Sequence, residues 1–247
     1  MQTYSPSIRL YVNFPLKKGA NITLKDKQAH YLFNVMRLKI GRKFLVFNGT
    51  DGEFEAEIIN KLKDKIKCKL TRKTREQPEE PRLNLIFSLV KKDRVFNIIE
   101  KCTELGVSNF QPIISERTQN KNFRLERFQL NAVEASEQTN RLTIPRINKV
   151  QKLSEVIEGW NKNDTIIFCN ENGGKPIVNI LNNISKPLSI LIGPEGGFSK
   201  KELEYFVNFD FIKSVSLGPR ILRADTAAIA SVTCYQSFVG DWSDSNE

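Results

Sequence analysis

Residues 188–202 read LSILIGPEGGFSKKE, and this stretch indicates the fold of the second half of the chain. Its first five residues are almost all apolar, as in a strand of a parallel sheet that is covered on both faces. The glycine-rich turn 193–197 follows, and Ser199-Lys-Lys-Glu202 has the spacing of a capping box, which begins a helix. A buried strand, a turn and a helix in this order predict an α/β fold.

The same alternation recurs along residues 83–238. Further strands are predicted at 83–90, 110–114, 164–169 and 212–217, and further helices at 93–105, 123–138 and 224–238. Strands that alternate with helices predict a parallel sheet with helices on both faces. No apolar run approaches the roughly 18 to 20 residues of a membrane span, and the N-terminus lacks the pattern of a secretory signal.

The residues before this region follow a different pattern. Short alternating segments with glycine turns predict a small β-barrel or curled sheet, interrupted by one helix near 25–38. Residues 74–82, TREQPEEPR, carry two prolines and three glutamates and are typical of a linker. We therefore divide the chain into a β domain (1–73), a linker (74–82) and an α/β domain (83–247).

The positive charge of the protein is concentrated in the β domain. The net charge is +10, but residues 1–72 hold 15 basic and 6 acidic side chains, a net charge of +9. A basic module of this kind favours an anionic partner such as a nucleic-acid backbone. A solvated surface that serves solubility is the alternative.

Several classes of chemistry are excluded by composition. The four cysteines, Cys68, Cys102, Cys169 and Cys234, are far apart and are expected to be buried free thiols of a cytoplasmic protein. His30 is the only histidine, so a metal site built on several histidines is excluded and no metal is predicted. The phosphate-binding patterns G-x-x-x-x-G-K-[ST] and G-x-G-x-x-G are both missing.

A second glycine-containing turn accompanies the first. Residues 217–223, LGPRILR, follow a predicted strand, as residues 193–197 do. Ligands of parallel sheets bind at the carboxyl ends of strands, so the two turns predict a pocket lined by backbone groups. Such a pocket suits a neutral or zwitterionic cofactor with an adenine edge. Each turn could also be purely structural. Basic residues near the turns can bind phosphates or form ordinary ion pairs, and they are Lys91, Lys92, Arg94, Arg220 and Arg223.

Six ordered motifs resemble a known family over nearly the whole chain. They are HYLFNVMRLKIG (30–41) followed by FNG (47–49) and DG (51–52), KDR (92–94) with IEKCTELGV (99–107), ISERT (114–118), ASEQTNR (135–141), IGPEGGF (192–198) and LGPRILR (217–223). The chain resembles the bacterial small-subunit (16S) ribosomal RNA uracil-N3 methyltransferases, the RsmE family of the SPOUT superfamily.

The resemblance implies a PUA-like β-barrel domain followed by an α/β domain with a trefoil knot. It also implies S-adenosyl-L-methionine as cofactor, a homodimer, and as partner the small-subunit ribosomal RNA within the assembled small subunit. The cofactor residues that it implies are Leu89, Ile192, Gly193, Pro194, Glu195, Gly196, Gly197, Leu217, Gly218, Ile221 and Leu222. No membrane partner is expected.

The methyl acceptor would be N3 of a uridine, which must lose its proton. We assign charge stabilisation to Arg223 or Arg220, and orientation of the base or proton acceptance to Glu195. The candidate RNA-binding residues are basic, and they are Arg9, Arg37, Lys39, Arg42, Lys43, Lys92, Arg94 and Arg141.

The last motif departs from the family pattern. Relatives usually continue Arg-Thr-Glu-Thr-Ala, whereas this chain has Ala224 and Asp225 at the second and third positions. Three alternatives therefore remain at this point. They are a related methyltransferase for another RNA nucleotide, a non-catalytic RNA-binding protein of ribosome assembly, and an enzyme for an anionic small molecule.

Overall fold

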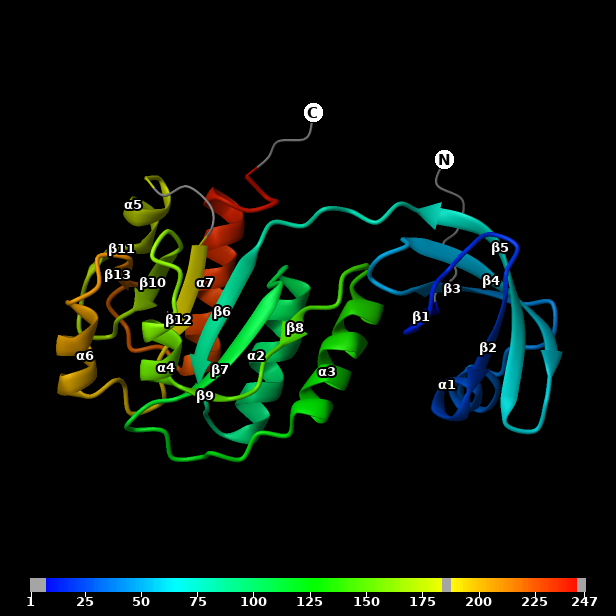
Figure 1. Ribbon diagram of the computed structural model, residues 1–247, viewed down its shortest axis with the longest axis horizontal. Coiled ribbons are helices and arrows are strands. Elements are labelled where there is room, and N and C mark those ends of the chain that lie inside the picture. Colours follow the sequence, from blue (N-terminus) through cyan, green and yellow to red (C-terminus); the bar gives the residue numbers. More distant parts are fainter. Residues whose placement is uncertain (1–7, 184–187, 244–247) are drawn as a thin grey trace. The chain divides into compact units, whose positions relative to one another are not determined.

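The computed structural model describes residues 8–183 and 188–243, which form two compact units (Figure 1). The first unit contains the chain up to Glu79 together with Ser136–Thr143, and the second contains Glu80–Ala135 and the chain from Ile144 onward. The last strand of the first unit runs to Arg75, so the first two residues of the predicted linker belong to a strand. The inclusion of Ser136–Thr143 in the first unit has no counterpart in the sequence pattern.

A five-stranded sheet forms the first unit, in the order β1-β3-β4-β5-β2. Its strands are β1 (Arg9–Tyr11), β2 (Asn21–Lys25), β3 (Lys43–Phe47), β4 (Glu53–Lys61) and β5 (Lys65–Arg75). Only the β1–β3 pair is parallel. The long β4–β5 pair contains three register shifts, and irregularities of this kind bend a sheet. The bend lets one apolar face enclose a core that includes Leu24, Phe44 and Ile58.

The predicted helix of the first unit is shorter than its pattern indicated. Helix α1 (Asp26–His30) continues as one π-helical segment, η1 (Tyr31–Val35). The helix ends there because Arg37 adopts a left-handed backbone conformation, with φ of 52°. The residues that follow form an exposed loop before β3.

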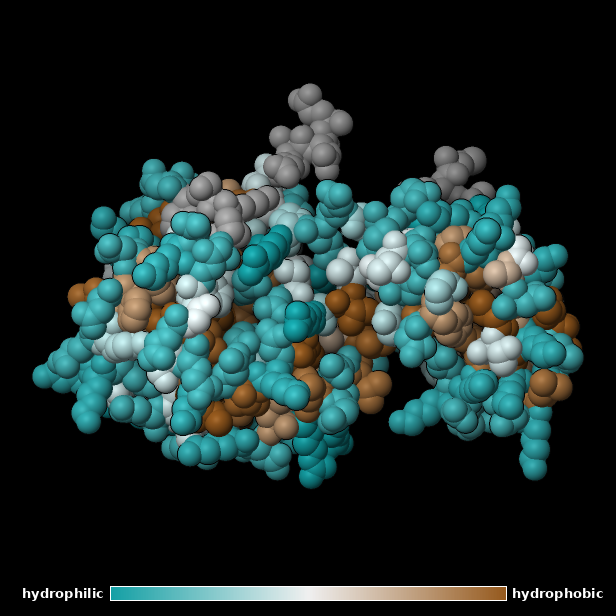
Figure 2. All heavy atoms as spheres, in the orientation of Figure 1, coloured by the Kyte–Doolittle hydropathy of each residue, from teal (hydrophilic) through white to brown (hydrophobic). Residues whose placement is uncertain are grey.

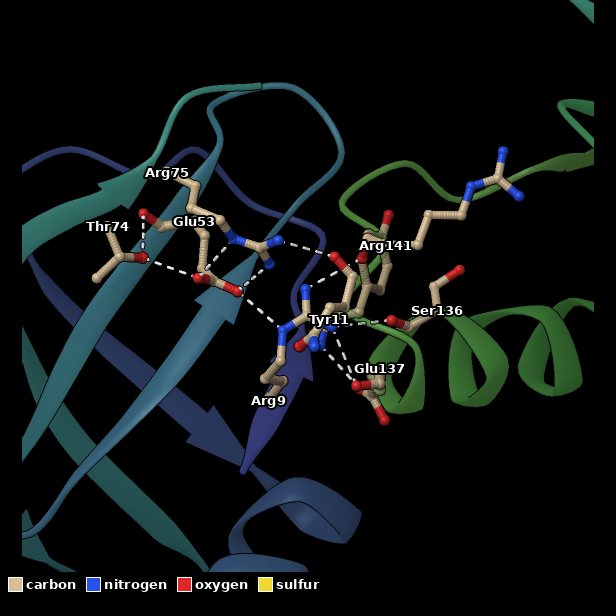
Figure 3. A network of polar contacts seen from close by, with 9 residues as sticks. Arg9, Tyr11, Glu53, Thr74, Arg75, Ser136, Glu137 and Arg141 are labelled. Carbon is tan, nitrogen blue, oxygen red and sulfur yellow. Dashed lines mark hydrogen bonds and ion pairs between the residues drawn. The ribbon is translucent and has the colours of Figure 1, made fainter. Parts of the chain in front are cut away.

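Arg9 is the centre of a buried polar network in the first unit (Figure 3). Its Nε donates to Glu53 Oε2 at 2.8 Å, and its Nη1 and Nη2 donate to the carbonyl oxygens of Ser136, Glu137 and Arg141 at 2.9, 3.0 and 3.1 Å. The guanidinium also lies 4.6 Å from the centre of the Phe47 ring. These contacts hold Ser136–Thr143 against the strands of this unit.

A parallel sheet forms the second unit, in the order β11-β13-β10-β12-β6-β7-β8, and β9 also pairs with β7. Its strands are β6 (Leu83–Ser88), β7 (Asn109–Ile114), β8 (Arg146–Ile147), β9 (Gln151–Lys152), β10 (Thr165–Cys169), β11 (Lys175–Pro176), β12 (Leu188–Ile192) and β13 (Ile212–Ser216). Its helices are α2 (Lys92–Glu104), α3 (Leu125–Gln138), α4 (Leu153–Glu158), α5 (Ile177–Leu181), α6 (Lys200–Phe206) and α7 (Ala224–Phe238). The longer elements are those that the sequence predicted, and the two-residue strands, α4 and α5 are additions.

Alternate residues of the central strands enter two separate cores. Leu85 and Phe87 of β6 pack with residues of α2, α3, α5 and α7, whereas Ile86 packs on the opposite face with residues of α4 and α6. The prediction of helices on both faces of a parallel sheet is therefore confirmed. Val232 and Tyr235 of α7 are fully buried in the first of these cores, so apolar residues of this helix are explained by core packing.

The face of the molecule that Figure 2 shows is mostly hydrophilic, with separate apolar patches. The exposed large apolar side chains of the second unit include Ile221, Phe238 and Trp242, at 80%, 43% and 56% exposure. Among the described residues, no helix has the length and apolar character needed to cross a membrane.

Candidate active site

A cavity of about 220 Å³ lies at the carboxyl ends of three neighbouring strands, β13, β10 and β12. Both glycine-containing turns contribute to it. Most of the residues predicted to hold a cofactor line this cavity, and they are Ile192, Gly193, Pro194, Glu195, Gly197, Leu217, Gly218, Ile221 and Leu222. The structure thus brings together the segments 192–197 and 217–222, which are separate in the sequence.

Two of the predicted cofactor residues do not line the cavity. Leu89 is 2% exposed and packs in the core of the second unit, where its N–H donates to the Ile113 carbonyl. Gly196 faces the other side of its turn, and its carbonyl oxygen accepts a hydrogen bond from Arg117 at 2.8 Å. Leu89 follows β6, whereas the cavity lies at the ends of β13, β10 and β12, and the cofactor role of Leu89 stays a prediction.

The end of β10 contributes residues that sequence reasoning missed. Phe168, Cys169, Asn170 and Glu171 all line the cavity. The two turns follow β12 and β13, and β10 lies between these strands in the sheet. The sequence shows that β10 is a strand, but it carries no signal for the strand order that places β10 there.

Glycine is required at two positions of the turns. Gly197 has φ of +65°, and a Cβ at this position would collide with the Glu171 carboxylate. Gly218 has φ of +110°, which side-chain-bearing residues rarely adopt. The shape of the cavity therefore depends on residues without a side chain.

The first turn is held by the elements that follow it. Ser199 and Glu202 form the predicted capping box, with Ser199 N–H donating to Glu202 Oε2 at 2.8 Å and Glu202 N–H donating to Ser199 Oγ at 3.2 Å. The other carboxylate oxygen of Glu202 accepts the Glu116 N–H at 2.8 Å. The ring of Phe198 packs edge-on against Phe168 and Phe206. The residues that directly follow the turn 193–197 are thus held in place by hydrogen bonds and by aromatic packing.

Positive side chains surround the cavity. Arg220 and Arg223 line it and are exposed, and neither forms an ion pair with any residue that the structure describes. Arg94 also lines the cavity, and its Nη1 lies 3.2 Å from Glu195 Oε1. Glu195 therefore has a cation beside its carboxylate, whereas Arg220 and Arg223 can bind an external anion.

The cavity contains one thiol. Burial raises the pKa of Cys169 to about 12, so this side chain is a neutral thiol near pH 7. All four cysteines are free. Thiolate chemistry at this site is not supported.

The two residues that depart from the family motif lie at the start of α7. Ala224 is 7% exposed and lines the cavity. Asp225 accepts a hydrogen bond from Asn97 of α2 at 3.0 Å, and its Oδ1 is buried with no hydrogen-bond partner. Asp225, which is shorter than the glutamate of the family motif, therefore links the start of α7 to α2, close to Arg223 in the sequence.

The predicted RNA-binding residues divide by exposure. Arg37, Lys39 and Arg42 are exposed in the loop between η1 and β3, and Lys43, the exposed first residue of β3, pairs with Glu55 at 2.9 Å. Lys92 is exposed at the start of α2. Arg141, by contrast, is only 9% exposed.

Arg9 is a correction to the predicted set. It is 7% exposed, and its guanidinium is already occupied by Glu53 and three carbonyl oxygens. A guanidinium whose donors are committed inside a core cannot contact a phosphate without breaking that core. Its role is structural.

Comparisons with known proteins agree with this geometry. A family model described as an RNA methyltransferase domain matches residues 77–236, and a model of an RNA methyltransferase PUA domain matches residues 24–71. Ribosomal RNA small subunit methyltransferase E of Rickettsia conorii is 34% identical over 228 residues, which cover 91% of this chain and 93% of the relative. The chain belongs to the ribosomal RNA small subunit methyltransferase E family.

Solved structures share the fold over most of the chain. The enzyme from Neisseria gonorrhoeae, determined with bound S-adenosyl methionine, is 27% identical, with a TM-score of 0.87 over 97% of this chain and 100% of that one. A protein from Legionella pneumophila described as a putative methyltransferase, also in complex with this cofactor, is 26% identical, with a TM-score of 0.85 over the same shares of the two chains. The family membership confirms the sequence-based resemblance and the mixed α/β fold with an N-terminal PUA domain.

Proposed function

We propose that this protein transfers a methyl group from S-adenosyl-L-methionine to N3 of a uridine in small-subunit ribosomal RNA. The observation that carries the proposal is the cavity at the ends of β13, β10 and β12, where both family turns meet Arg220 and Arg223, which form no ion pair with a described residue. Family membership supports the reaction class and the RNA substrate.

The residues of the cavity fit this cofactor. The backbone N–H groups of Leu217, Ile221 and Leu222 have no acceptor among the described residues, and all three residues line the cavity. Free backbone donors and apolar side chains such as Ile192 and Phe168 suit an adenine ring, which presents apolar faces and a polar edge. When bound, S-adenosyl-L-methionine supplies an electrophilic methyl group on its sulfonium.

The charged residues would then act on the RNA base. Arg223 and Arg220 are free to stabilise the negative charge that develops on the uracil oxygens as N3 loses its proton. Glu195, oriented by Arg94, would position the base or accept that proton. The protein contributes mainly orientation and charge stabilisation.

The RNA must present an exposed base edge. N3 lies on the Watson–Crick edge, so the target uridine has to be unpaired or flipped out of its helix. The exposed cations of the loop between η1 and β3 would bind nearby RNA phosphates. This loop belongs to the proposed basic β domain (1–73), which precedes the α/β domain (83–247). We place the reaction in the cytoplasm, on the assembled small subunit.

We further propose that the active form is a homodimer with a knotted C-terminal domain. The exposed apolar side chains Ile221, Phe238 and Trp242 support a second copy packing near the two ends of α7. Light scattering of the purified protein would test this assembly directly.

The test of the function is methyl transfer from labelled S-adenosyl-L-methionine to unmodified small subunits and to naked ribosomal RNA, with mass mapping of the product. Label in one N3-methyluridine is expected, and Arg223→Ala should lower kcat while leaving cofactor affinity within about twofold. Label on another nucleotide would contradict the proposed target. Absence of label with tight RNA binding would identify a non-catalytic binding protein.

A further inference from the structure

A second cavity, of about 200 Å³, lies in the same unit between the beginnings of α2 and α3. We call it the α2–α3 pocket. The residues that line it are Lys92, Phe96, Asn120, Asn122, Arg124, Arg127 and Phe128. None of the roles given so far uses this pocket, although Lys92 belongs to the predicted RNA-binding set.

Aromatic rings form one side of the pocket. The rings of Phe96 and Phe128 have centroids 4.9 Å apart, and Phe123 stacks on Phe128 at 4.6 Å with an interplanar angle of 23°. Phe128 is 3% exposed and anchors the group in the core, whereas Phe96 and Phe123 are only partly buried. Partly exposed rings that are held in place are a surface on which a nucleic-acid base can stack.

Positive charge surrounds these rings. Lys92, Arg124 and Arg127 are exposed, and none of them forms an ion pair with a residue in the described part of the chain. Lys92 Nζ lies 5.7 Å from the centre of the Phe96 ring. Guanidinium groups beside an aromatic surface match the phosphate and the base of one nucleotide.

Polar amides complete the lining. Asn120 and Asn122 belong to one loop, which is shaped by a hydrogen bond from Asn122 N–H to Asn120 Oδ1 at 3.0 Å. Amide side chains both donate and accept, so they can bind a base edge. The cations, aromatic rings and amides together provide the groups that bind the phosphate, the face and the edge of a nucleotide.

Two elements of the second unit carry residues of both the α2–α3 pocket and the candidate active site. On the first turn of α2, Lys92 lines the α2–α3 pocket and Arg94 lines the active-site cavity. On the loop after β7, Arg117 binds the Gly196 carbonyl of the active-site turn, and Asn120 lines the pocket. A single RNA strand with one nucleotide in the active site therefore has a second binding position close by.

We propose that the α2–α3 pocket binds a nucleotide of the substrate RNA that flanks the methylated base, with its base on Phe96 and its phosphate on Arg124 and Arg127. This inference rests on the proposed function, since it names a second recognition position for the same substrate. This position would hold the RNA strand on the α/β domain itself, in addition to the contacts that the basic β module makes with the RNA.

The experiment compares RNA binding by the full-length protein and the double variant R124Q/R127Q. The probe is a fluorescent single-stranded RNA of mixed sequence, and its affinity is measured by anisotropy at several salt concentrations. The slope of log affinity against log salt should fall in magnitude by about 0.7, because the two arginines bind one phosphate and each phosphate contact to single-stranded nucleic acid contributes about 0.7. Cofactor affinity, measured by calorimetry, should remain unchanged.

The matched control is K162Q/K201Q, which removes two exposed charges from the same unit outside both cavities. It should retain the wild-type slope. Phe96→Leu tests the stacking: RNA should bind several-fold more weakly with no change of slope, and a 2-aminopurine in the RNA should lose its quenching.

Two results would overturn the proposal. One is equal RNA binding by R124Q/R127Q and the control. The other is unchanged RNA binding with a later elution in size-exclusion chromatography, which would assign the pocket to contact between two copies of the chain. Failure of the wild-type protein to bind cofactor or transfer methyl would instead overturn the proposed function, because the RNA comparison uses no cofactor.

Discussion

Arginine has different roles in this protein because its surroundings differ. Arg9 is buried, where it is paired with Glu53 and bound to carbonyl oxygens, whereas Arg220 and Arg223 line an open cavity without a paired acid among the described residues. The sequence predicts an RNA-binding role for Arg9, because sequence alone does not distinguish a buried basic residue of the β domain from an exposed one. Burial decides between the two roles, and it depends on which strands pack together.

Substitution of Arg9 should destabilise the first unit. Arg9→Ala would remove one of the two arginines that bind the buried Glu53 carboxylate and would leave the carbonyl oxygens of Ser136, Glu137 and Arg141 without this donor, and buried groups left unsatisfied cost about 1 to 3 kcal/mol. Urea unfolding is the measurement. The control Arg42→Ala, in the exposed loop, should change the free energy of unfolding by no more than about 0.5 kcal/mol. A loss as small as that of the control would contradict the structural role.

The pairing of Glu53 predicts a dependence on pH. Burial by itself would raise the pKa of Glu53, but hydrogen bonds from Arg75, Arg9 and Thr74 outweigh it, and the pKa lies below the ordinary value of 4.5. The charged form therefore stabilises the folded state above about pH 4.5, and this contribution is lost as the pH falls through the folded-state pKa.

The corresponding measurement is urea unfolding at pH 7 and at pH values below 4.5. Wild-type protein should lose more stability on acidification than Glu53→Gln, which has no carboxylate to titrate at this position. Equal losses in the two proteins would contradict the assignment of this titration to Glu53.

Substitution of one glycine of the first turn should weaken cofactor binding. Gly197→Ala would impose a positive φ on alanine and place its Cβ against Glu171, so affinity for S-adenosyl-L-methionine should fall at least about tenfold. Gly41→Ala is the control, because Gly41 has φ of +82° and open space around it, far from the cavity in sequence. Calorimetry should show a cofactor defect for the first variant only.

At the scale of elements, loops are positioned by the helices beside them. Helix α6 holds the first turn through its capping box, and Glu202 also fixes the loop after β7 by accepting the Glu116 N–H. Helix α7 begins at Ala224, and Asp225 near its start is joined to α2 by Asn97. The capping box could be predicted because it is local in sequence. The contact to Glu116 could not, since it joins segments 86 residues apart.

Glu202 should therefore affect both stability and the site. Glu202→Gln replaces one carboxylate oxygen by a donor that faces a backbone N–H, at a cost of about 1 to 3 kcal/mol. Thermal unfolding and cofactor affinity should both decrease. Glu204→Gln, exposed on the same helix, should alter neither. A normal cofactor affinity in the first variant would show that the turn is held by other contacts.

At the scale of the whole molecule, charge and chemistry are divided between the parts of the chain. Residues 1–72 carry a net charge of +9, whereas the cavity with both family turns lies in the second unit. This division predicts that RNA affinity and cofactor affinity can be changed separately. The α2–α3 pocket adds a smaller cationic region to the second unit.

Arg37 tests this division. Arg37 is exposed beside other cations, so Arg37→Ala should weaken RNA binding and lower its salt dependence by roughly one phosphate contact. Cofactor affinity should be unchanged. Lys18→Ala, an exposed cation elsewhere in the same unit, is the matched control. Equal loss of RNA and cofactor binding in Arg37→Ala would contradict the separation.

The amino-acid sequence is enough to predict the alternation of strands and helices, the basic N-terminal module and the two turns at strand ends. These features depend on apolar periodicity, charge and glycine, which are local properties. The packing of the folded chain, in contrast, places β10 between β12 and β13, buries Leu89 and Arg9, and joins Ser136–Thr143 to the first unit. Strand order and burial depend on contacts between segments distant in sequence, and no local pattern of residues specifies them.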